Sequence, residues 1–162
     1  MDMITKRIGI DIMGVIIPKS TEGGTINEFM NCPALPDSLN CIKKLVSIYK
    51  PENIFVISSC PEYAEKVLIE WLNKNNFFDE INFCKSNINF CRTKADKAPI
   101  AEKLNLLYFI DDKISVLDHM KNIIPNRIQL TTDELLNEQK NNKDIISFIN
   151  WPSIIKYISG KK

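Results

Sequence analysis

Short apolar runs with no polar alternation, separated by helical patterns, are the feature that most constrains the fold of this sequence. Residues 54–57 and 106–110 are apolar throughout, and residues 7–11 contain a third such run. A strand with two apolar faces needs cover on both sides, as in parallel sheets flanked by helices. We therefore predict an α/β fold, a three-layer Rossmann-like parallel sheet with helices on both faces and right-handed crossovers.

Helical patterns fill the intervals between these runs. Residues 38–49 repeat apolar positions at helical spacing, with Asp37 as an N-cap and Pro51 beyond the end. Residues 14–36 contain Gly, Pro and Thr and predict a flap or long loop, with room for a hairpin. We predict a single domain over residues 1–162, with further helices at 60–73, 96–105, 114–121, 132–139 and 143–158 and further strands at 81–84 and 127–130. The apolar stretch after residue 145 is expected to pack on the sheet, with a homo-oligomer contact as the alternative.

The amino-acid composition excludes several classes of function. A net charge of +1, from 21 basic and 20 acidic residues, argues against a dedicated nucleic-acid or anionic-membrane binder. The single His excludes catalysis by His pairs, and five Cys without a C-x-x-C pair exclude a structural zinc site. The apolar run of residues 8–17 contains Asp11, is too short to span a bilayer and lacks a cleavage site for a signal peptide. We expect a cytoplasmic protein with reduced thiols.

Carboxylates follow two of the predicted buried strands. Asp11 ends the first, and Asp111 and Asp112 end the strand at 106–110. Because ligands bind at the carboxyl ends of parallel strands, these three side chains are expected to converge. Like charges held together need a cation, and carboxylate oxygens suit Mg²⁺. For any one of them alone, a simple loop cap is the plainer interpretation.

A hydroxyl and an amine complete this set. Ser58 and Ser59 follow the strand at 54–57 and precede a helix start, where a hydroxyl can bind a phosphoryl oxygen or cap the helix. Lys97 lies at the start of the helix before the Asp111 strand, where it could neutralise a phosphate. Considered singly, Lys97 is as well explained as a surface charge, and Lys94 is the alternative site lysine.

The order of these residues resembles the haloacid dehalogenase-like superfamily. The matching stretches are residues 8–16, 54–58 and 97–112, and the resemblance covers about residues 7–130. A receiver domain uses similar residue types, but its acidic pair comes first, whereas here Asp111-Asp112 comes last. The resemblance implies a fold of this superfamily of the capless type, without a large cap domain.

The resemblance also implies roles for the individual residues. Asp11 would be the nucleophile that takes the phosphoryl group, and Lys97 would stabilise the negative charge. Ser58, with Ser59, would bind the substrate phosphate. Mg²⁺ would be held by Asp11, the backbone carbonyl of Met13, Asp111 and Asp112. The activity implied is that of a Mg²⁺-dependent phosphohydrolase or phosphotransferase with an aspartyl-phosphate intermediate.

Met13 departs from the pattern of this superfamily. Its phosphatases carry a second Asp two residues after the nucleophile, which protonates the leaving oxygen and then activates water. A thioether can do neither, so the acid–base step is impaired or altered. The alternative is a catalytically silent protein that binds a phosphorylated ligand or protein partner. A third interpretation is a different reaction at Asp11, such as carbon–halogen or carbon–phosphorus cleavage.

The short connections also bear on access to the site. Between Ser58 and Lys97 there is space for one helix and one strand but not for a cap. The site is therefore expected to be open. An open site suggests a large or macromolecular phosphorylated substrate, or a neighbouring subunit that acts as the lid.

Overall fold

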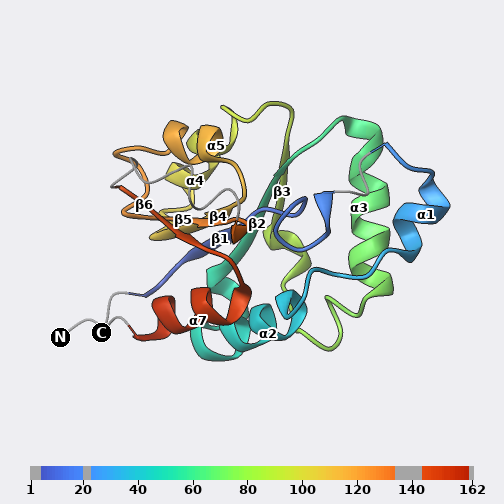
Figure 1. Ribbon diagram of the computed structural model, residues 1–162, viewed down its shortest axis with the longest axis horizontal. Coiled ribbons are helices and arrows are strands. Elements are labelled where there is room, and N and C mark those ends of the chain that lie inside the picture. Colours follow the sequence, from blue (N-terminus) through green and yellow to red (C-terminus); the bar gives the residue numbers. More distant parts are fainter. Residues whose placement is uncertain (1–4, 20–22, 134–143, 161–162) are drawn as a thin grey trace.

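A six-stranded parallel sheet forms the centre of the protein in the computed structural model, which describes residues 5–19, 23–133 and 144–160 (Figure 1). Its strand order is β3-β2-β1-β4-β5-β6, and every pairing is parallel. The predicted α/β fold with a Rossmann-like parallel sheet is confirmed. The strands are β1 (Ile8–Ile10), β2 (Ile54–Ser59), β3 (Ile88–Cys91), β4 (Tyr108–Asp111), β5 (Asn126–Leu130) and β6 (Ile145–Phe148).

Helices cover both faces of the sheet. In Figure 1, α2 and α7 lie on one side and α4 and α5 on the other. The α2, α3 and α7 side holds the larger core, and a second apolar cluster lies under α4 and α5. The helices are α1 (Ile26–Asn31), α2 (Ser38–Tyr49), α3 (Glu62–Lys74), α4 (Lys97–Lys103), α5 (Ile114–His119) and α7 (Trp151–Gly160), with 3-10 turns at Pro51–Asn53 and Lys85–Asn87.

The chain reverses its direction of winding at the centre of the sheet. From β1 it winds to β2 and β3 on one side, and then it crosses to β4 on the other side of β1. The carboxyl ends of β1 and β4 therefore flank a topological switch point, where open α/β sheets form their binding crevices.

The predicted strand at 81–84 is wrong. Ile81 and Phe83 are buried in the core, and Phe83 stacks against Phe77 with ring centroids 4.6 Å apart. Asn82 between them adopts a left-handed backbone with φ 61°, which an extended strand does not permit. The third strand is instead β3, Ile88–Cys91, seven residues later.

The predicted helix at 143–158 is a strand followed by a shorter helix. β6 extends the sheet by pairing with β5, with Ile145 beside Arg127 and Phe148 beside Leu130. α7 begins only at Trp151, where the side chain of Asn150 accepts a hydrogen bond from the backbone N–H of Ser153 at 2.9 Å. The predicted helix at 132–139 lies almost wholly outside the described residues.

The described part of the predicted flap or long loop, residues 14–19 and 23–36, contains a tight turn and the short helix α1. The carbonyl of Ile12 accepts backbone hydrogen bonds from the turn that follows it, and α1 starts with a capping box between Thr25 and Glu28. α1 lies beside α3 (Figure 1), and the indole N–H of Trp71 donates to the carbonyl of Cys32 at 3.2 Å.

Across the described segments, no helix combines the length and the apolar character that a bilayer crossing needs.

Candidate active site

Two of the three predicted carboxylates lie side by side at the switch point. Ile10 of β1 pairs with Ile110 of β4, so the residues that follow them, Asp11 and Asp111, stand at the same level. The backbone N–H of Asp11 continues the ladder by donating to the carbonyl of Ile110 at 3.0 Å. Two neighbouring strands of the sheet thus bring together carboxylates that are 100 residues apart in the sequence.

Lys97 bridges these two carboxylates. Its Nζ lies 2.9 Å from Oδ1 of Asp11 and 2.9 Å from Oδ2 of Asp111. The side chain is buried, because it enters the site from the first turn of α4 above the apolar cluster around Phe109. Lys94, the alternative site lysine, is exposed to solvent. The geometry therefore favours Lys97 as the lysine of the site.

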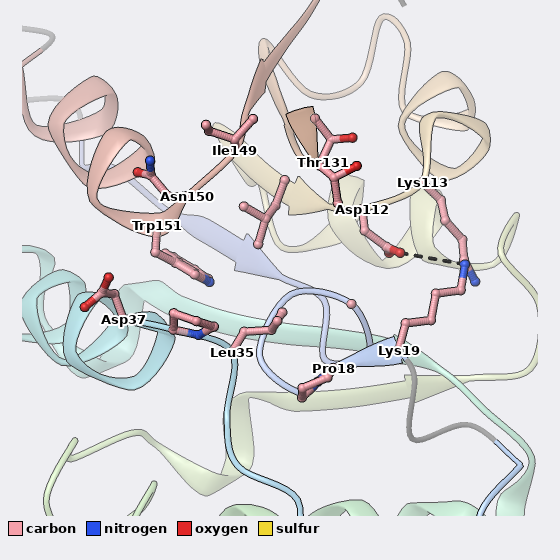
Figure 2. A pocket seen from close by; sticks show the side chains of 14 residues that line it. Pro18, Lys19, Leu35, Asp37, Asp112, Lys113, Thr131, Ile149, Asn150 and Trp151 are labelled. Carbon is pink, nitrogen blue, oxygen red and sulfur yellow. Dashed lines mark ion pairs between the residues drawn. The ribbon is translucent and has the colours of Figure 1, made fainter. Parts of the chain in front are cut away.

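Asp112 is held at the other side of the site by close backbone packing. Gly14 adopts φ +82°, which favours glycine, and a Cβ built there would lie 2.4 Å from Oδ2 of Asp112, so a side chain at this position would displace the carboxylate. Lys19 pairs with the same oxygen at 3.9 Å (Figure 2). Gln129 donates to the backbone carbonyl of Asp112 at 3.1 Å. The sequence analysis missed these neighbours, although a glycine three residues after the predicted nucleophile was an available signal.

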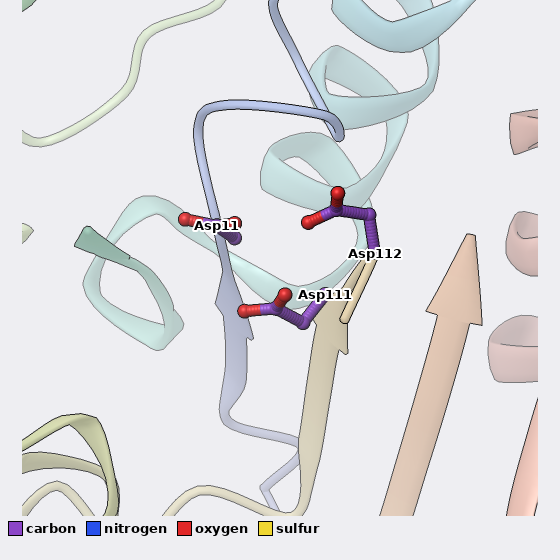
Figure 3. A group of neighbouring side chains, drawn as sticks. All are labelled: Asp11, Asp111 and Asp112. Atoms are coloured by element: carbon purple, nitrogen blue, oxygen red, sulfur yellow. The ribbon is translucent and has the colours of Figure 1, made fainter. Parts of the chain in front are cut away.

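The three carboxylates form a group that could hold a metal ion. One oxygen from each of Asp11, Asp111 and Asp112 lies within 4.8 Å of the others, and Figure 3 shows the side chains gathered at the ends of β1 and β4. Lys97 contacts only one oxygen of Asp11 and one of Asp111. Oδ1 of Asp112 is buried without a hydrogen-bond partner among the described residues. Oxygen atoms thus stay available for a hard cation, and the set suits Mg²⁺.

Charge in this group is unbalanced. Burial raises the pKa of Asp11 to about 8, and the charge of Asp111 adds to the rise while Lys97 opposes it. Burial and Asp111 also raise the pKa of Asp112 to about 6. Burial works against the charge of Lys97, but Asp11 and Asp111 outweigh it and raise the pKa of Lys97. When ionised, the three carboxylates outnumber the two ammonium groups that pair with them, those of Lys97 and Lys19, and a divalent cation would offset the excess of negative charge.

The two predicted hydroxyls face opposite sides of the sheet. Successive residues of a strand point to opposite faces, and Phe55 and Ile57 of β2 lie in the apolar cluster on the α4 side. Ser59 continues that face, and Ser58, which is buried, belongs to the other. Ser59 pairs with Cys91, whose thiol is close enough to Lys97 and Asp11 for their charges to affect its pKa. Ser59 is therefore the hydroxyl on the side of Asp11 and Lys97.

Met13 lies in the turn that follows Asp11. Its side chain is half-buried and packs against the larger core, and the residue forms an isolated bridge with Ile17. No titratable group occupies the position two residues after Asp11.

The chain resembles known proteins in sequence and in fold. No family profile matches the chain. A candidate nucleotidase of Oceanobacillus iheyensis is 26% identical over 128 residues, which are 79% of this chain and 63% of that protein. The chain thus spans less than two thirds of the length of this curated relative.

Solved structures are similar over nearly the whole chain. One is the D,D-heptose 1,7-bisphosphate phosphatase of B. bronchiseptica in complex with magnesium and phosphate, with a TM-score of 0.70, 12% identity and coverage of 97% of this chain and 99% of that one. Another is a candidate haloacid dehalogenase-like hydrolase of Burkholderia xenovorans, with a TM-score of 0.63, 9% identity and coverage of 94% and 98%. The predicted fold is thereby confirmed: this chain has the fold of that phosphatase and of that haloacid dehalogenase-like hydrolase.

Proposed function

We propose that the protein is a Mg²⁺-dependent phosphohydrolase or phosphotransferase that works through an aspartyl phosphate on Asp11. The observation that carries this proposal is the buried Lys97 held 2.9 Å from both Asp11 and Asp111, with Asp112 beside them. A structural ion pair needs one carboxylate. Two carboxylates on one buried lysine, with a third carboxylate beside them, are costly unless a cation and an anionic ligand use them.

Each residue has a role in this proposal. A carboxylate oxygen of Asp11 attacks phosphorus, the bond to the leaving oxygen breaks, and the phosphoryl group passes to Asp11. Lys97 offsets the negative charge on the transferred group, and Ser59, with Ser58 behind it, orients a phosphoryl oxygen. Asp11, Asp111, Asp112 and the carbonyl of Met13 would hold Mg²⁺, which supplies charge neutralisation between the nucleophile and the phosphate.

The departing oxygen must take its proton from water, because Met13 offers none. This restricts fast turnover to leaving groups that are stable as anions, such as phenolates or carboxylates. Water must also attack the aspartyl phosphate without a base at position 13. General acid–base help is worth about 10²–10⁴ in rate, so turnover of alkyl phosphates is expected to be slow by this margin.

A phosphate-release assay tests the proposal. The protein is assayed with Mg²⁺ or with EDTA against acetyl phosphate, p-nitrophenyl phosphate and nucleoside monophosphates, the last because the Oceanobacillus relative is described as a candidate nucleotidase. We expect Mg²⁺-dependent release that Asp11→Asn abolishes and that Asp118→Asn, an exposed control, leaves intact. Release that survives Asp11→Asn would contradict the proposed nucleophile. The proposal also covers large phosphorylated substrates. A neighbouring subunit would then act as the lid of the site.

Met13 supports a second candidate, a catalytically silent protein that binds a phosphorylated ligand or protein. In that case the protein binds orthovanadate or inorganic phosphate with Mg²⁺, as isothermal titration would show, yet releases no phosphate from any substrate. Met13→Asp separates the two candidates, because a merely impaired enzyme gains turnover from it and a silent binder does not.

A further inference from the structure

A row of polar side chains crosses three neighbouring strands at the edge of the sheet that bears the site. Asp111 of β4 stands beside Gln129 of β5 in the strand register, and Gln129 stands beside Ser147 of β6. Residues that stand opposite each other in adjacent strands point to the same face, so these three side chains share one face of the sheet. Only Asp111 has a role in the chemistry described above.

Gln129 is buried inside this row, with 2% of the residue exposed. Its neighbours along β5, Ile128 and Leu130, pack in the larger core. A buried amide is costly unless its nitrogen and its oxygen are both hydrogen-bonded, and a strand covered on both faces is ordinarily apolar. The amide of Gln129 therefore points to a role that an apolar side chain could not fill.

The amide of Gln129 is fixed at both of its polar atoms. Nε2 donates to the backbone carbonyl of Asp112 at 3.1 Å, and Oε1 accepts from the hydroxyl of Ser147 at 2.8 Å. A backbone carbonyl can only accept, so the amide must present its nitrogen to Asp112 and its oxygen to Ser147. The hydroxyl of Ser147 thus holds the amide in the orientation from which it donates to Asp112.

The carbonyl that receives this hydrogen bond belongs to the loop that carries two of the three carboxylates. Oδ1 of Asp111 accepts from the backbone N–H of Lys113 at 3.0 Å and ties down the far side of the same loop. Figure 3 shows the carboxylate of Asp112 directed from the end of β4 towards Asp11. Gln129 therefore holds the backbone from which this carboxylate projects, and Oδ1 of the carboxylate is buried without a hydrogen-bond partner among the described residues.

We propose that Gln129, oriented by Ser147, is a positioning residue of the metal site, and that it holds Asp112 where its carboxylate reaches the cation. This inference rests on the proposed function, in which Asp11, Asp111 and Asp112 hold Mg²⁺. Gln129 and Ser147 act only through the backbone of Asp112. Hydrogen bonds that orient metal ligands in this way typically contribute about 10–100-fold to metal affinity.

Isothermal titration of the metal-free protein with Mg²⁺, in the absence of substrate, tests the proposal. Gln129→Met keeps the length of the side chain and removes both hydrogen bonds. Ser147→Ala removes only the orienting hydroxyl, and Ser147→Thr keeps it. Asn89→Leu is the matched control, because the amide of Asn89 on β3 also donates to a backbone carbonyl, that of Val56 at 3.2 Å, but lies outside the carboxylate group.

We expect Gln129→Met to raise the Kd for Mg²⁺ about tenfold or more, and Ser147→Ala to raise it by less, because the amide keeps its donor. Ser147→Thr and Asn89→Leu should leave the Kd within about twofold of the unaltered protein. The double variant Gln129→Met/Ser147→Ala is expected to match Gln129→Met alone, since both changes act through one chain of hydrogen bonds. Thermal melts in EDTA report stability separately, because an amide with a purely structural role would lower the midpoint without changing the Kd of the folded protein.

The outcomes separate this inference from the proposed function. If Gln129→Met and Ser147→Ala bind Mg²⁺ as tightly as Asn89→Leu does, the positioning role is wrong, while Mg²⁺-dependent release of phosphate would leave the proposed function standing. If Gln129→Met weakens Mg²⁺ binding but no substrate is turned over, the positioning role holds and the proposed reaction fails. Absence of Mg²⁺ binding to the unaltered protein overturns both.

Ser147 has its own decisive comparisons. If Gln129→Met does not fold, the Kd of Ser147→Ala against that of Ser147→Thr decides the proposal, and equal values overturn it. A double variant that binds Mg²⁺ more weakly than Gln129→Met overturns the assignment of Ser147, because its hydroxyl would then act by a route other than Gln129.

Discussion

In the proposed mechanism no acid or base acts from position 13, because the position two residues after Asp11 carries a thioether. Introducing an acid there supplies the missing proton to a departing alkoxide. We predict that Met13→Asp raises kcat for alkyl phosphates, such as glycerol phosphate, by about 10²–10⁴-fold. The same change leaves p-nitrophenyl phosphate nearly unaffected, because p-nitrophenolate departs without a proton.

The measurement is kcat for an alkyl phosphate and for p-nitrophenyl phosphate, in the unaltered protein and in Met13→Asp. Met13→Leu is the control, because it keeps an apolar, half-buried side chain. A thermal melt of each variant establishes that it is folded. Equal stimulation of both ester types by Met13→Asp would contradict the role assigned to this position, since leaving-group protonation distinguishes them.

Ser58 and Ser59 are adjacent in the sequence but face opposite sides of β2, which makes them a matched pair. Ser59 shares the face of Asp11 and Lys97, and a hydroxyl that donates to an anionic oxygen contributes about 1.5–3 kcal/mol. We predict that Ser59→Ala weakens binding of inorganic phosphate, measured with Mg²⁺ by isothermal titration, by about tenfold or more. Ser58→Ala should leave phosphate affinity within about twofold, and the reverse order would show that Ser58 is the ligand.

The sequence was sufficient to predict helices and strands where hydrophobic periodicity and burial agree. α2 spans residues 38–49 as predicted, and the strands β1 and β4, which lead to Asp11 and Asp111, lie within the predicted apolar runs to within one or two residues. The sequence was insufficient where one apolar stretch supports two structures. Residues 145–148 are apolar enough for a helix, and their pairing with β5, a contact distant in sequence, makes them a strand.

The candidate site also has a part that the sequence predicts and a part that only tertiary contacts determine. Strand ends and chain order predicted Asp11, Lys97, Asp111 and Asp112, because parallel topology alone brings them to one edge. The surroundings of Asp112 depend on tertiary contacts with Gly14 and Lys19, which no local pattern encodes. The choice between Ser58 and Ser59 likewise needs the register of β2.

Helix α7 connects the end of the chain to the turn that shapes the site. The indole N–H of the buried Trp151 donates to the carbonyl of Val15, in the turn between Met13 and Ile17. Trp151→Phe leaves that carbonyl without its donor, so we predict a loss of about 1–3 kcal/mol in the free energy of unfolding, measured by urea denaturation. Ser159→Ala removes an exposed hydrogen bond from the same helix and should cost much less. Equal losses would mean that the contact with Val15 contributes little.

The protein is nearly neutral, yet it concentrates negative charge at one point. The net charge is +1, yet Asp11 and Asp111 share the buried Lys97 and Asp112 lies close to both carboxylates. A global field therefore cannot attract a phosphate to this edge. Local cations must do so, and they are Lys97, Lys19 and the metal ion that the carboxylates are proposed to hold.

This concentration of charge makes stability depend on pH in a way that Mg²⁺ should reverse. The folded pKa of Asp11 is about 8 against 3.8 for an ordinary Asp, so the folded, metal-free protein binds more protons than the unfolded chain between these values. Stability of the metal-free protein is therefore predicted to fall as pH rises through this window. Bound Mg²⁺ favours the ionised carboxylates, so the stabilisation it gives should grow over the same range.

Thermal melts in EDTA and in saturating Mg²⁺ measure both effects, and the quantity of interest is the difference between the two midpoints at each pH. Asp11→Asn cannot ionise at this position, so it should reduce the pH dependence in EDTA and leave the smaller part that Asp112 contributes. Asp118→Asn, at an exposed position on α5, should leave the dependence as it is in the unaltered protein. If the difference between the midpoints in Mg²⁺ and in EDTA stays constant from acid to neutral pH, the cation does not bind at the three carboxylates. The proposed metal site would then fail even though the fold and the Lys97 bridge remained, because neither of those depends on a bound ion.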